Sequence, residues 1–371
     1  MGKLLVVGSV ALDTVKTPFG EASEVLGGSA TYFSASASYF TTVDLIAVVG
    51  EDFPSQHLAF LKSRNIDLTG LERRAGATFR WKGEYSHQLN EAHTLDTKLN
   101  VFETFRPKIP ESYRSPEVLF LGNIDPELQL DVLTKLPRPP LVACDTMNFW
   151  INGKRDALWR VLEKVDILII NDGEARALGG DSNLVKVAST VLARGPKHLI
   201  IKRGEYGVLM FSGGQVFGAP AFPLEDVRDP TGAGDTFAGG FLGYLAATGN
   251  RSVDSFKQAI IFGSVMASFT VESLVLTVCE SWITKRSRID SGSSSASPIS
   301  RIFRDTLRGI SKHGWCFRRS QPVDGSMAGG LCDLRRNQAT IEGLLSGRHG
   351  EPGARSAESV CVLSEGRAAR S

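Results

Sequence analysis

Short runs of apolar residues recur along the first 274 positions, and most are bounded by Gly, Pro, Asn or Asp. Such continuous runs are typical of strands buried on both faces of a parallel sheet. The runs are Leu4–Val7, Leu45–Val49, Val118–Leu121, Leu141–Ala143, Ile167–Ile170, Leu199–Ile201 and Val208–Phe211. Several alternate with segments of helical spacing: Ser55–Arg64, Arg155–Lys164 and Leu184–Arg194. This alternation predicts an α/β fold with a doubly wound, mostly parallel sheet, in which ligands bind at the carboxyl ends of the strands.

The segment Thr78–His87 has a different pattern, because its polar and apolar residues nearly alternate. Alternation of this kind indicates half-exposed antiparallel strands. We therefore expect a small β-sheet outside the main one, built from segments near residues 13–26 and 76–100, which acts as a lid.

The pattern stops after Leu274. Residues 275–371 contain 15 Lys and Arg against 9 Asp and Glu, and no Phe, Trp or Tyr follows Phe317. Such a segment cannot bury much apolar area, so we expect a disordered basic tail after a domain of residues 1–274. The tail either binds an acidic partner or is not a selected sequence, such as the product of a shifted reading frame. The sharp break favours the second interpretation.

Composition narrows the classes of protein. Of the 371 residues, 42% are hydrophobic and 22% charged, which is typical of a globular protein. No apolar run is long enough to span a membrane, and the N-terminus lacks a signal-peptide pattern, so we expect a cytoplasmic protein without a membrane partner. The first 274 residues carry a net negative charge, which argues against a nucleic-acid partner. Cys144 is their only cysteine, so neither a zinc site nor a disulfide framework is predicted.

The segment Asp229–Gly240 carries the clearest chemistry. Its Thr-Gly-Ala-Gly-Asp stretch precedes small and apolar residues at helical spacing. The amides of Gly232, Ala233 and Gly234 would then lie at a helix N-terminus, where free N–H groups and the helix dipole bind anions. A carboxylate beside a phosphate is repelled, unless it accepts a proton from an attacking hydroxyl group. The sequence therefore predicts Asp235 as a catalytic base.

The full string Asp-Pro-Thr-Gly-Ala-Gly-Asp-Thr-Phe-Ala-Gly-Gly resembles the C-terminal signature of the ribokinase/PfkB family. P-loop, dinucleotide-binding and protein-kinase motifs are absent from the sequence. The resemblance covers roughly residues 3–274 and implies a ribokinase-like α/β/α sandwich that uses ATP and Mg²⁺.

The resemblance also implies a substrate site. Asp13, which follows the first strand, corresponds to a family residue that binds substrate hydroxyl groups. Gly27 and Gly28 resemble the N-terminal Gly-Gly signature, where the backbone closes on the substrate. From the residues alone, these are a turn and a helix start. Asn123 lies at a strand end and could line the same crevice.

Further positions would hold ATP and cations. Asn171 and Glu174 match the family's Asn-x-x-Glu pattern, which organises Mg²⁺ largely through water, and they also fit a helix capping box. Lys202 and Gly204 belong to a loop that, in the family, lies along the ATP phosphates, although a solvated charge explains Lys202 equally well. The remaining cofactor-binding positions are Thr231, Gly263 and Ser264.

Asp229 and Thr231 match positions whose oxygens hold a monovalent cation such as K⁺ in some family members. The family usually continues past the adenine-flanking helix with a Gly-containing turn, and here Leu274–Thr277 stands instead. The adenine side of the pocket is therefore the part of the site that departs from the pattern.

The resulting hypothesis is transfer of the ATP γ-phosphoryl group to an alcohol of a small molecule. A neutral sugar is our first expectation, because no cluster of basic residues indicates a phosphorylated sugar. The alternatives are an adenosine-type nucleoside kinase and a non-catalytic metabolite-binding pseudokinase. Family members often pair through their lids, so a homodimer is expected from the resemblance.

Overall fold

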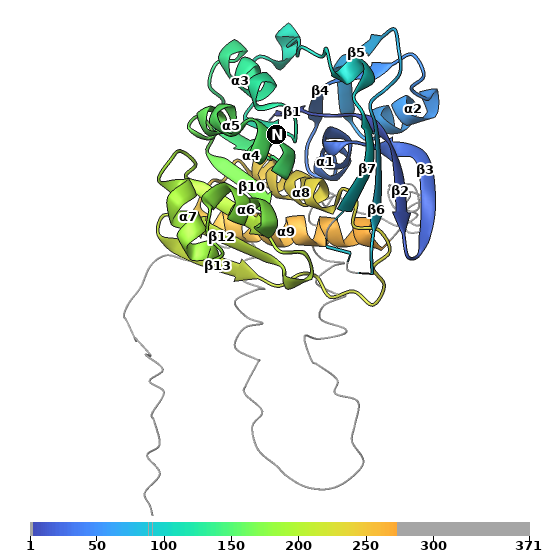
Figure 1. The fold of residues 1–371 in the computed structure, drawn as a ribbon. Coiled ribbons are helices and arrows are strands. Elements are labelled where there is room, and N and C mark those ends of the chain that lie inside the picture. Colours follow the sequence, from blue (N-terminus) through green and yellow to red (C-terminus); the bar gives the residue numbers. More distant parts are fainter. Residues whose placement is uncertain (1–2, 88, 91, 273–371) are drawn as a thin grey trace, which may run out of the picture. The chain divides into compact units, whose positions relative to one another are not determined.

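The computed structural model describes residues 3–87, 89–90 and 92–272. Its main element is a nine-stranded sheet in the order β13-β12-β11-β10-β9-β8-β1-β4-β5 (Figure 1). The strands are β1 (Leu4–Val7), β4 (Val43–Gly50), β5 (Ile66–Arg74), β8 (Val118–Leu121), β9 (Leu141–Cys144), β10 (Ile167–Asn171), β11 (His198–Lys202), β12 (Val208–Ser212) and β13 (Gln215–Ala219). All seven predicted runs form strands of this sheet, which confirms the α/β fold. The predicted tail lies outside the described residues.

The strands near the two edges of the sheet correct the prediction. The pattern places Val208–Phe211 among the parallel strands, but β12 runs antiparallel to β11. Only the short 3₁₀ helix η3 (Gly204–Tyr206) separates the two strands, and a parallel crossover needs a dozen or more residues. The edge strands β5 and β13 were not expected. The exposed positions of β5 carry polar residues that interrupt its apolar run, and β13 is short and has a single buried residue, Ala219.

Helices cover both faces of the sheet. One face packs against α1 (Ser29–Ala37), α2 (Ser55–Ser63), α8 (Ala233–Thr248) and α9 (Val253–Val271). The other packs against α3 (Pro126–Lys135), α4 (Asn148–Gly153), α5 (Arg155–Leu162), α6 (Asp172–Gly179), α7 (Leu184–Leu192) and the 3₁₀ helices η1 (Asn100–Phe102) and η2 (Glu111–Tyr113). Leu4 and Val6 of β1 belong to the first core, and Leu5 and Val7 to the second. Since successive strand residues point to opposite faces, burial on both sides explains the continuous apolar runs.

A second, four-stranded sheet has the order β3-β2-β6-β7. Its strands are β2 (Ala11–Thr17), β3 (Gly20–Gly27), β6 (Arg80–Tyr85) and β7 (Ala92–Lys98). The two segments predicted near residues 13–26 and 76–100 therefore form one separate sheet. β6 is antiparallel to β7, as expected, but parallel to β2.

Asp52 fixes the base of this second sheet to the main one. Its Oδ1 accepts hydrogen bonds from the backbone N–H of Thr78 (2.7 Å) and from the Thr78 hydroxyl (2.6 Å). Its Oδ2 lies 2.8 Å from Nη1 of Arg80, the first residue of β6. Asp52 is thus structural, and it holds the point where the chain enters β6.

Candidate active site

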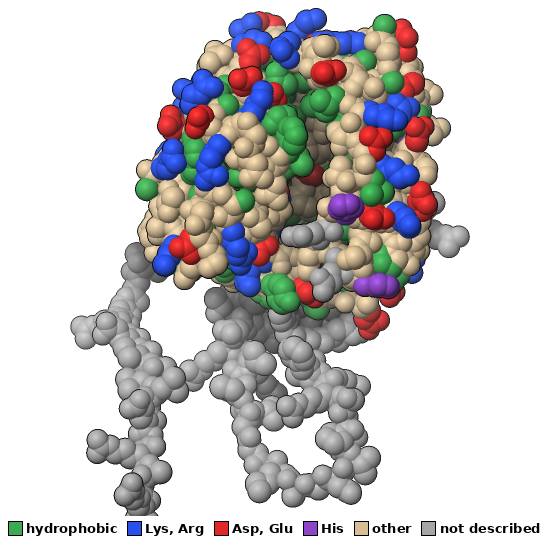
Figure 2. Space-filling model, viewed as in Figure 1, with side chains coloured by type: hydrophobic (Ala, Val, Ile, Leu, Met, Phe, Trp, Pro, Cys, Tyr) green, Lys and Arg blue, Asp and Glu red, His purple; other side chains and the backbone are tan. Residues whose placement is uncertain are grey.

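The predicted site residues meet where the carboxyl ends of the parallel strands face α8 and the small sheet. Figure 2 shows that this face of the molecule is hollowed by a deep cleft, with acidic surface visible at its floor. A doubly wound sheet binds ligands at the carboxyl ends of its strands, because the loops that follow the strands converge there.

The N-terminus of α8 lies in this region. Gly232, its N-cap, is in the left-handed region (φ 71°), and a β-carbon built there would lie 2.3 Å from the ring of Tyr32. The amide of Ala233 donates to the carbonyl of Pro230 (3.1 Å). Among the described residues, the amides of Gly232 and Gly234 have no acceptor. Two of the three predicted amides are therefore available for an anion, whereas a turn occupies that of Ala233.

Asp235 is half-buried in the first turn of α8, close to the buried carboxylates of Asp13, Asp145 and Glu174. Burial raises the pKa of Asp235 well above its usual range, the charge of Asp145 raises it further, and Lys202 opposes both. Burial likewise raises the pKa of Asp13 to about 7 and that of Glu174 to about 7. The fold thus gathers four acidic side chains that are far apart in sequence, and burial raises the pKa of each of them.

Lys202, the last residue of β11, is the cation of this group. Its Nζ lies 3.6 Å from Oδ2 of Asp145, and only 17% and 8% of these side chains are exposed. A β-carbon built on Gly234 would lie 2.8 Å from the same Nζ, so the ammonium lies against the start of α8. Burial lowers the pKa of Lys202, but Asp145, Glu174 and Asp235 more than offset this and raise it above its usual range. Lys202 is therefore a buried charge and not a solvated one.

Asp13 and the Gly-Gly pair depend on each other. The N–H of Gly28 donates to Oδ2 of Asp13 at 3.3 Å. A β-carbon on Gly27 would lie 1.9 Å from that same oxygen, and one on Gly28 (φ 94°) would lie 2.5 Å from the carbonyl of Ser9. Only glycine fits at either position, and the resulting turn keeps the Asp13 carboxylate at the start of α1.

Asn171 and Glu174 form the capping box that their spacing allows. Oδ1 of Asn171 accepts from the N–H of Glu174, and Oε2 of Glu174 accepts from the N–H of Asn171, both at 2.8 Å. This arrangement uses one carboxylate oxygen of Glu174 and leaves the other for a ligand.

The small sheet contacts the main sheet's loops at two places beyond its base. The hydroxyl groups of Thr231 and Tyr85 are hydrogen-bonded at 3.3 Å, which joins β6 to the loop before α8. A β-carbon on Gly204 (φ 54°) would lie 2.2 Å from Oδ1 of Asn90, which lies between β6 and β7. Both contacts bring the small sheet to predicted site residues.

Three other predicted residues differ in their contacts with the rest of the protein. Oδ1 of Asn123 accepts from the indole N–H of Trp150 at 3.0 Å. Gly263 packs against Phe237, since a β-carbon there would lie 2.7 Å from the Phe237 carbonyl. Ser264, the next residue of α9, has a buried hydroxyl without a hydrogen-bond partner among the described residues. Gly263 is thus needed for close packing of α8 on α9.

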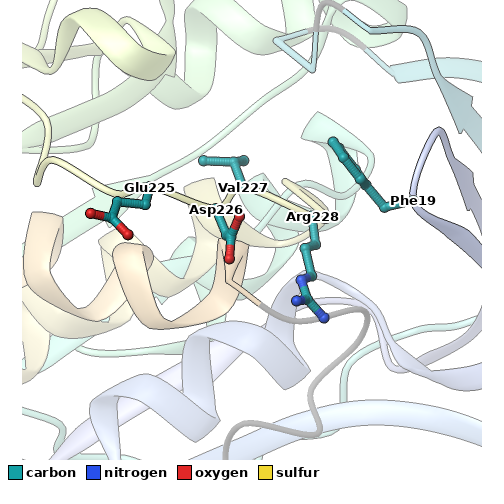
Figure 3. Close-up of a pocket in the computed structure, with 5 residues that line it drawn as sticks. All are labelled: Phe19, Glu225, Asp226, Val227 and Arg228. Carbon is teal, nitrogen blue, oxygen red and sulfur yellow. The ribbon is translucent and has the colours of Figure 1, made fainter.

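Asp229 lies in the loop between β13 and α8, a few residues before the helix begins. It is buried, and its Oδ1 accepts from the N–H of Thr231 at 2.9 Å. Just before it, residues 225–228 and Phe19 line a separate cavity of about 350 Å³ (Figure 3). Phe19 comes from the turn between β2 and β3, so this cavity lies between the small sheet and the loop.

The sequence marks Asp145 only as one of the strand-end polar residues that could line the crevice, and it assigns neither Tyr32 nor Tyr85 to the site. Asp145 follows β9 directly, so its place at a strand end was the only signal available. Tyr32 and Tyr85 carry no signal at all, because an aromatic residue in a helix or strand is ordinarily a core residue.

This geometry defines a class of protein. A free helix N-terminus, a buried lysine and a proton-binding carboxylate in one cleft suit the transfer of a phosphoryl group to an alcohol. Residues 140–282 match the pfkB family of carbohydrate kinases. The cytidine kinase of Thermococcus kodakarensis is 33% identical over 249 residues, which cover 64% of this chain and 87% of that enzyme.

Solved structures agree on the fold. The nucleoside kinase of Methanocaldococcus jannaschii matches with a TM-score of 0.61 and 22% identity, over 74% of this chain and 92% of that one. A ribokinase II from Escherichia coli, in complex with ATP and Mg²⁺, matches with a TM-score of 0.62 and 18% identity, over 77% of this chain and all of that one. The chain belongs to the pfkB family of ribokinase-like kinases and is a phosphotransferase. Within the part that the structure describes, no helix is long and apolar enough to cross a membrane.

Proposed function

We propose that this kinase transfers the γ-phosphoryl group of ATP to a hydroxyl group of a nucleoside, with Asp235 as the base. The observation that carries the reaction is the position of Asp235, half-buried in the first turn of α8 beside free amides and Lys202. The similarity to a cytidine kinase, which extends over most of that enzyme, favours a nucleoside over the sugar that the sequence alone suggested.

The proposed reaction has one chemical step. Asp235 accepts the hydroxyl proton as the oxygen attacks the γ-phosphorus atom, and the bond from that phosphorus to the bridging oxygen breaks to release ADP. Charge that develops on the transferring group meets the amides of Gly232 and Gly234 and the ammonium of Lys202. The raised pKa of Asp235 suits a base, because a carboxylate with an ordinary pKa holds a proton too weakly.

The acceptor would bind on the other side of Asp235. Asp13 would accept hydrogen bonds from ribose hydroxyl groups, and the turn at Gly27 and Gly28 would close on the sugar. Asn123, fixed by Trp150, would lie at the edge of the same crevice. The Tyr85–Thr231 contact would close the small sheet as a lid over the acceptor and exclude water.

ATP and Mg²⁺ fit the residues present. The free oxygen of Glu174 and the side chain of Asn171 are hard oxygen donors, and Mg²⁺ keeps several waters, so few protein ligands suffice. Mg²⁺ would supply positive charge to the phosphate oxygens when bound. Gly204, Thr231, Gly263 and Ser264 remain proposed ATP contacts, and Asp229 with Thr231 a proposed K⁺ site. A cytoplasmic location and a homodimer through the lid likewise remain predictions.

The test is a panel of nucleosides and sugars assayed for ATP consumption with the native chain and with Asp235→Asn. We expect cytidine or another nucleoside to be phosphorylated best, and the variant to lose about 10²–10⁴-fold in kcat while it still binds an ATP analogue. The matched control is Asp254→Asn, which alters an acidic residue in the first turn of α9. Preferred turnover of a free sugar would support the second candidate, which the pfkB match favours. Unchanged turnover in Asp235→Asn would refute the base, and ATP binding without any turnover would indicate a pseudokinase.

A further inference from the structure

We propose that Asp145 is a positioning residue for the phosphoryl transfer: it holds the ammonium of Lys202 at the N-terminus of α8 and keeps it from pairing with Asp235. The inference rests on the proposed function, since it concerns the proposed base. It gives a role to a buried carboxylate that the reaction itself does not use.

Asp145 is held rigidly at the end of β9. Its N–H donates to the carbonyl of Leu121 (2.9 Å), and its carbonyl accepts from Nε2 of Gln129 (3.1 Å). Its Oδ1 accepts from the N–H of Thr146 (2.7 Å). These bonds fix the carboxylate, and the remaining oxygen, Oδ2, is the one that faces Lys202.

The ammonium of Lys202 has a choice of partners. Asp145, Glu174 and Asp235 all attract it, and the ion pair that the structure contains is the one with Asp145. Oε2 of Glu174 is already engaged by the N–H of Asn171. Without the charge of Asp145, the remaining carboxylates close to Lys202 are Glu174 and Asp235, and the ammonium would move toward them.

That movement would harm the reaction in a specific way. An opposite charge at close range lowers the pKa of a carboxyl by about 1–3 units, so an ammonium paired with Asp235 would weaken it as a base. It would also leave the free amides of α8, where the transferring group is expected. Asp145 would therefore affect kcat more than the binding of ATP.

The chain offers a matched control that separates this role from ordinary packing. Asp166 is another buried aspartate, with a side chain 7% exposed and Oδ1 3.0 Å from Nζ of Lys197. It precedes β10, so it lies at the amino ends of the strands, whereas the cleft lies at their carboxyl ends. Oδ1 of Asp166 also lies 3.0 Å from Nη2 of Arg138, and both cations are more than half exposed. Asp166→Asn therefore reports the cost of neutralising a buried aspartate that pairs with cations away from the site.

The first arm of the test is a double-mutant cycle in kcat. We expect Asp145→Asn to lower kcat at least tenfold in the native background, with the KM for ATP changed less than threefold. In the Lys202→Met background the same substitution should change kcat less than threefold, because its target is gone. Asp166→Asn should change kcat less than threefold in both backgrounds. An equal fall for Asp145→Asn in both backgrounds, or no fall in the native one, would overturn the inference.

The second arm does not depend on turnover. Crystal structures of the native chain and of Asp145→Asn should show Nζ of Lys202 leaving Gly234 and approaching Asp235 or Glu174 in the variant. An ammonium that stays against Gly234 would overturn the inference, even if the native chain phosphorylates no alcohol and the proposed function fails. Where Asp145→Asn does not fold, Asp145→Ser replaces it in both arms, since serine keeps an acceptor near the Thr146 amide.

Discussion

The carboxyl group of Asp13 should make the protein less stable at neutral pH, and Asp13→Asn should relieve this cost. The folded state holds the proton of Asp13 up to about pH 7, whereas an unfolded chain releases it near 3.8. The stabilising contribution of the protonated form is therefore complete below about pH 4 and is lost as the pH rises through 7. Each pKa unit is worth about 1.4 kcal/mol, so the full cost above pH 7 is about 4 kcal/mol.

Asparagine keeps the shape of the side chain and an acceptor for the N–H of Gly28. The pKa of about 7 already includes the hydrogen bond that the charged Asp13 accepts from Gly28, so that bond adds no separate cost. The net expectation is a variant that is about 4 kcal/mol more stable than the native chain above pH 7, and of similar stability near pH 4. Activity should fall in the same variant, because loss of a charged hydrogen bond to a substrate hydroxyl costs about 1.5–3 kcal/mol in kcat/KM.

The assay is urea unfolding of the native chain and of Asp13→Asn at several pH values from 4 to 8. The control is Asp96→Asn, which removes an exposed carboxylate of the same small sheet. A stability difference between native and Asp13→Asn chains that does not grow with pH would refute the burial argument. A variant that is less stable at pH 8 would show that the Asp13 charge is compensated in the folded state.

Three further predictions follow from the geometry. Gly232→Ala should abolish most activity and destabilise the fold by about 1–3 kcal/mol, since it forces a side chain into Tyr32 at positive φ. The control Gly249→Ala (φ 63°, no atom within 4 Å of the added β-carbon) should cost about 1 kcal/mol and leave kcat unchanged. Equal effects of the two variants on chemical unfolding and on turnover would argue against the close contact with Tyr32. Tyr85→Phe should raise the KM for the acceptor several-fold by removing the bond to Thr231, with little change in thermal stability, and an unchanged KM would argue against lid closure through this pair. Replacing K⁺ by a bulky organic cation should lower kcat if the monovalent site forms, and identical rates in both salts would exclude a catalytic need for it.

Local patterns in the sequence were sufficient for much of this protein. Apolar runs predicted the central strands, because burial on both faces leaves no room for polar positions, as in Ile167–Ile170. The Asp229–Gly240 segment predicted the helix start and its acidic residue, since both depend on neighbouring positions only. The box formed by Asn171 and Glu174 could be read from their spacing for the same reason.

Other features depended on contacts between distant segments. The antiparallel direction of β12 follows from the short connection to β11, and the polar edge strand β5 follows from exposure on one side. The occupied amide of Ala233 results from the way the chain turns at Pro230. None of these alters the local pattern of residue types from which elements are predicted.

The group of charges in the cleft shows most clearly the difference between what local sequence determines and what tertiary structure determines. In the sequence, each charged residue of this group is simply a polar residue near the end of a strand or the start of a helix. This holds for Asp13, Asp145, Glu174, Lys202 and Asp235 alike. Their protonation depends on burial and on each other's charges, and both are set by how the strands and helices are arranged. The sequence alone therefore indicated that a phosphoryl-transfer site exists. Only the tertiary structure decided which carboxylate pairs with Lys202 and which carboxyl groups have a raised pKa, because electrostatic interactions depend on distance in space.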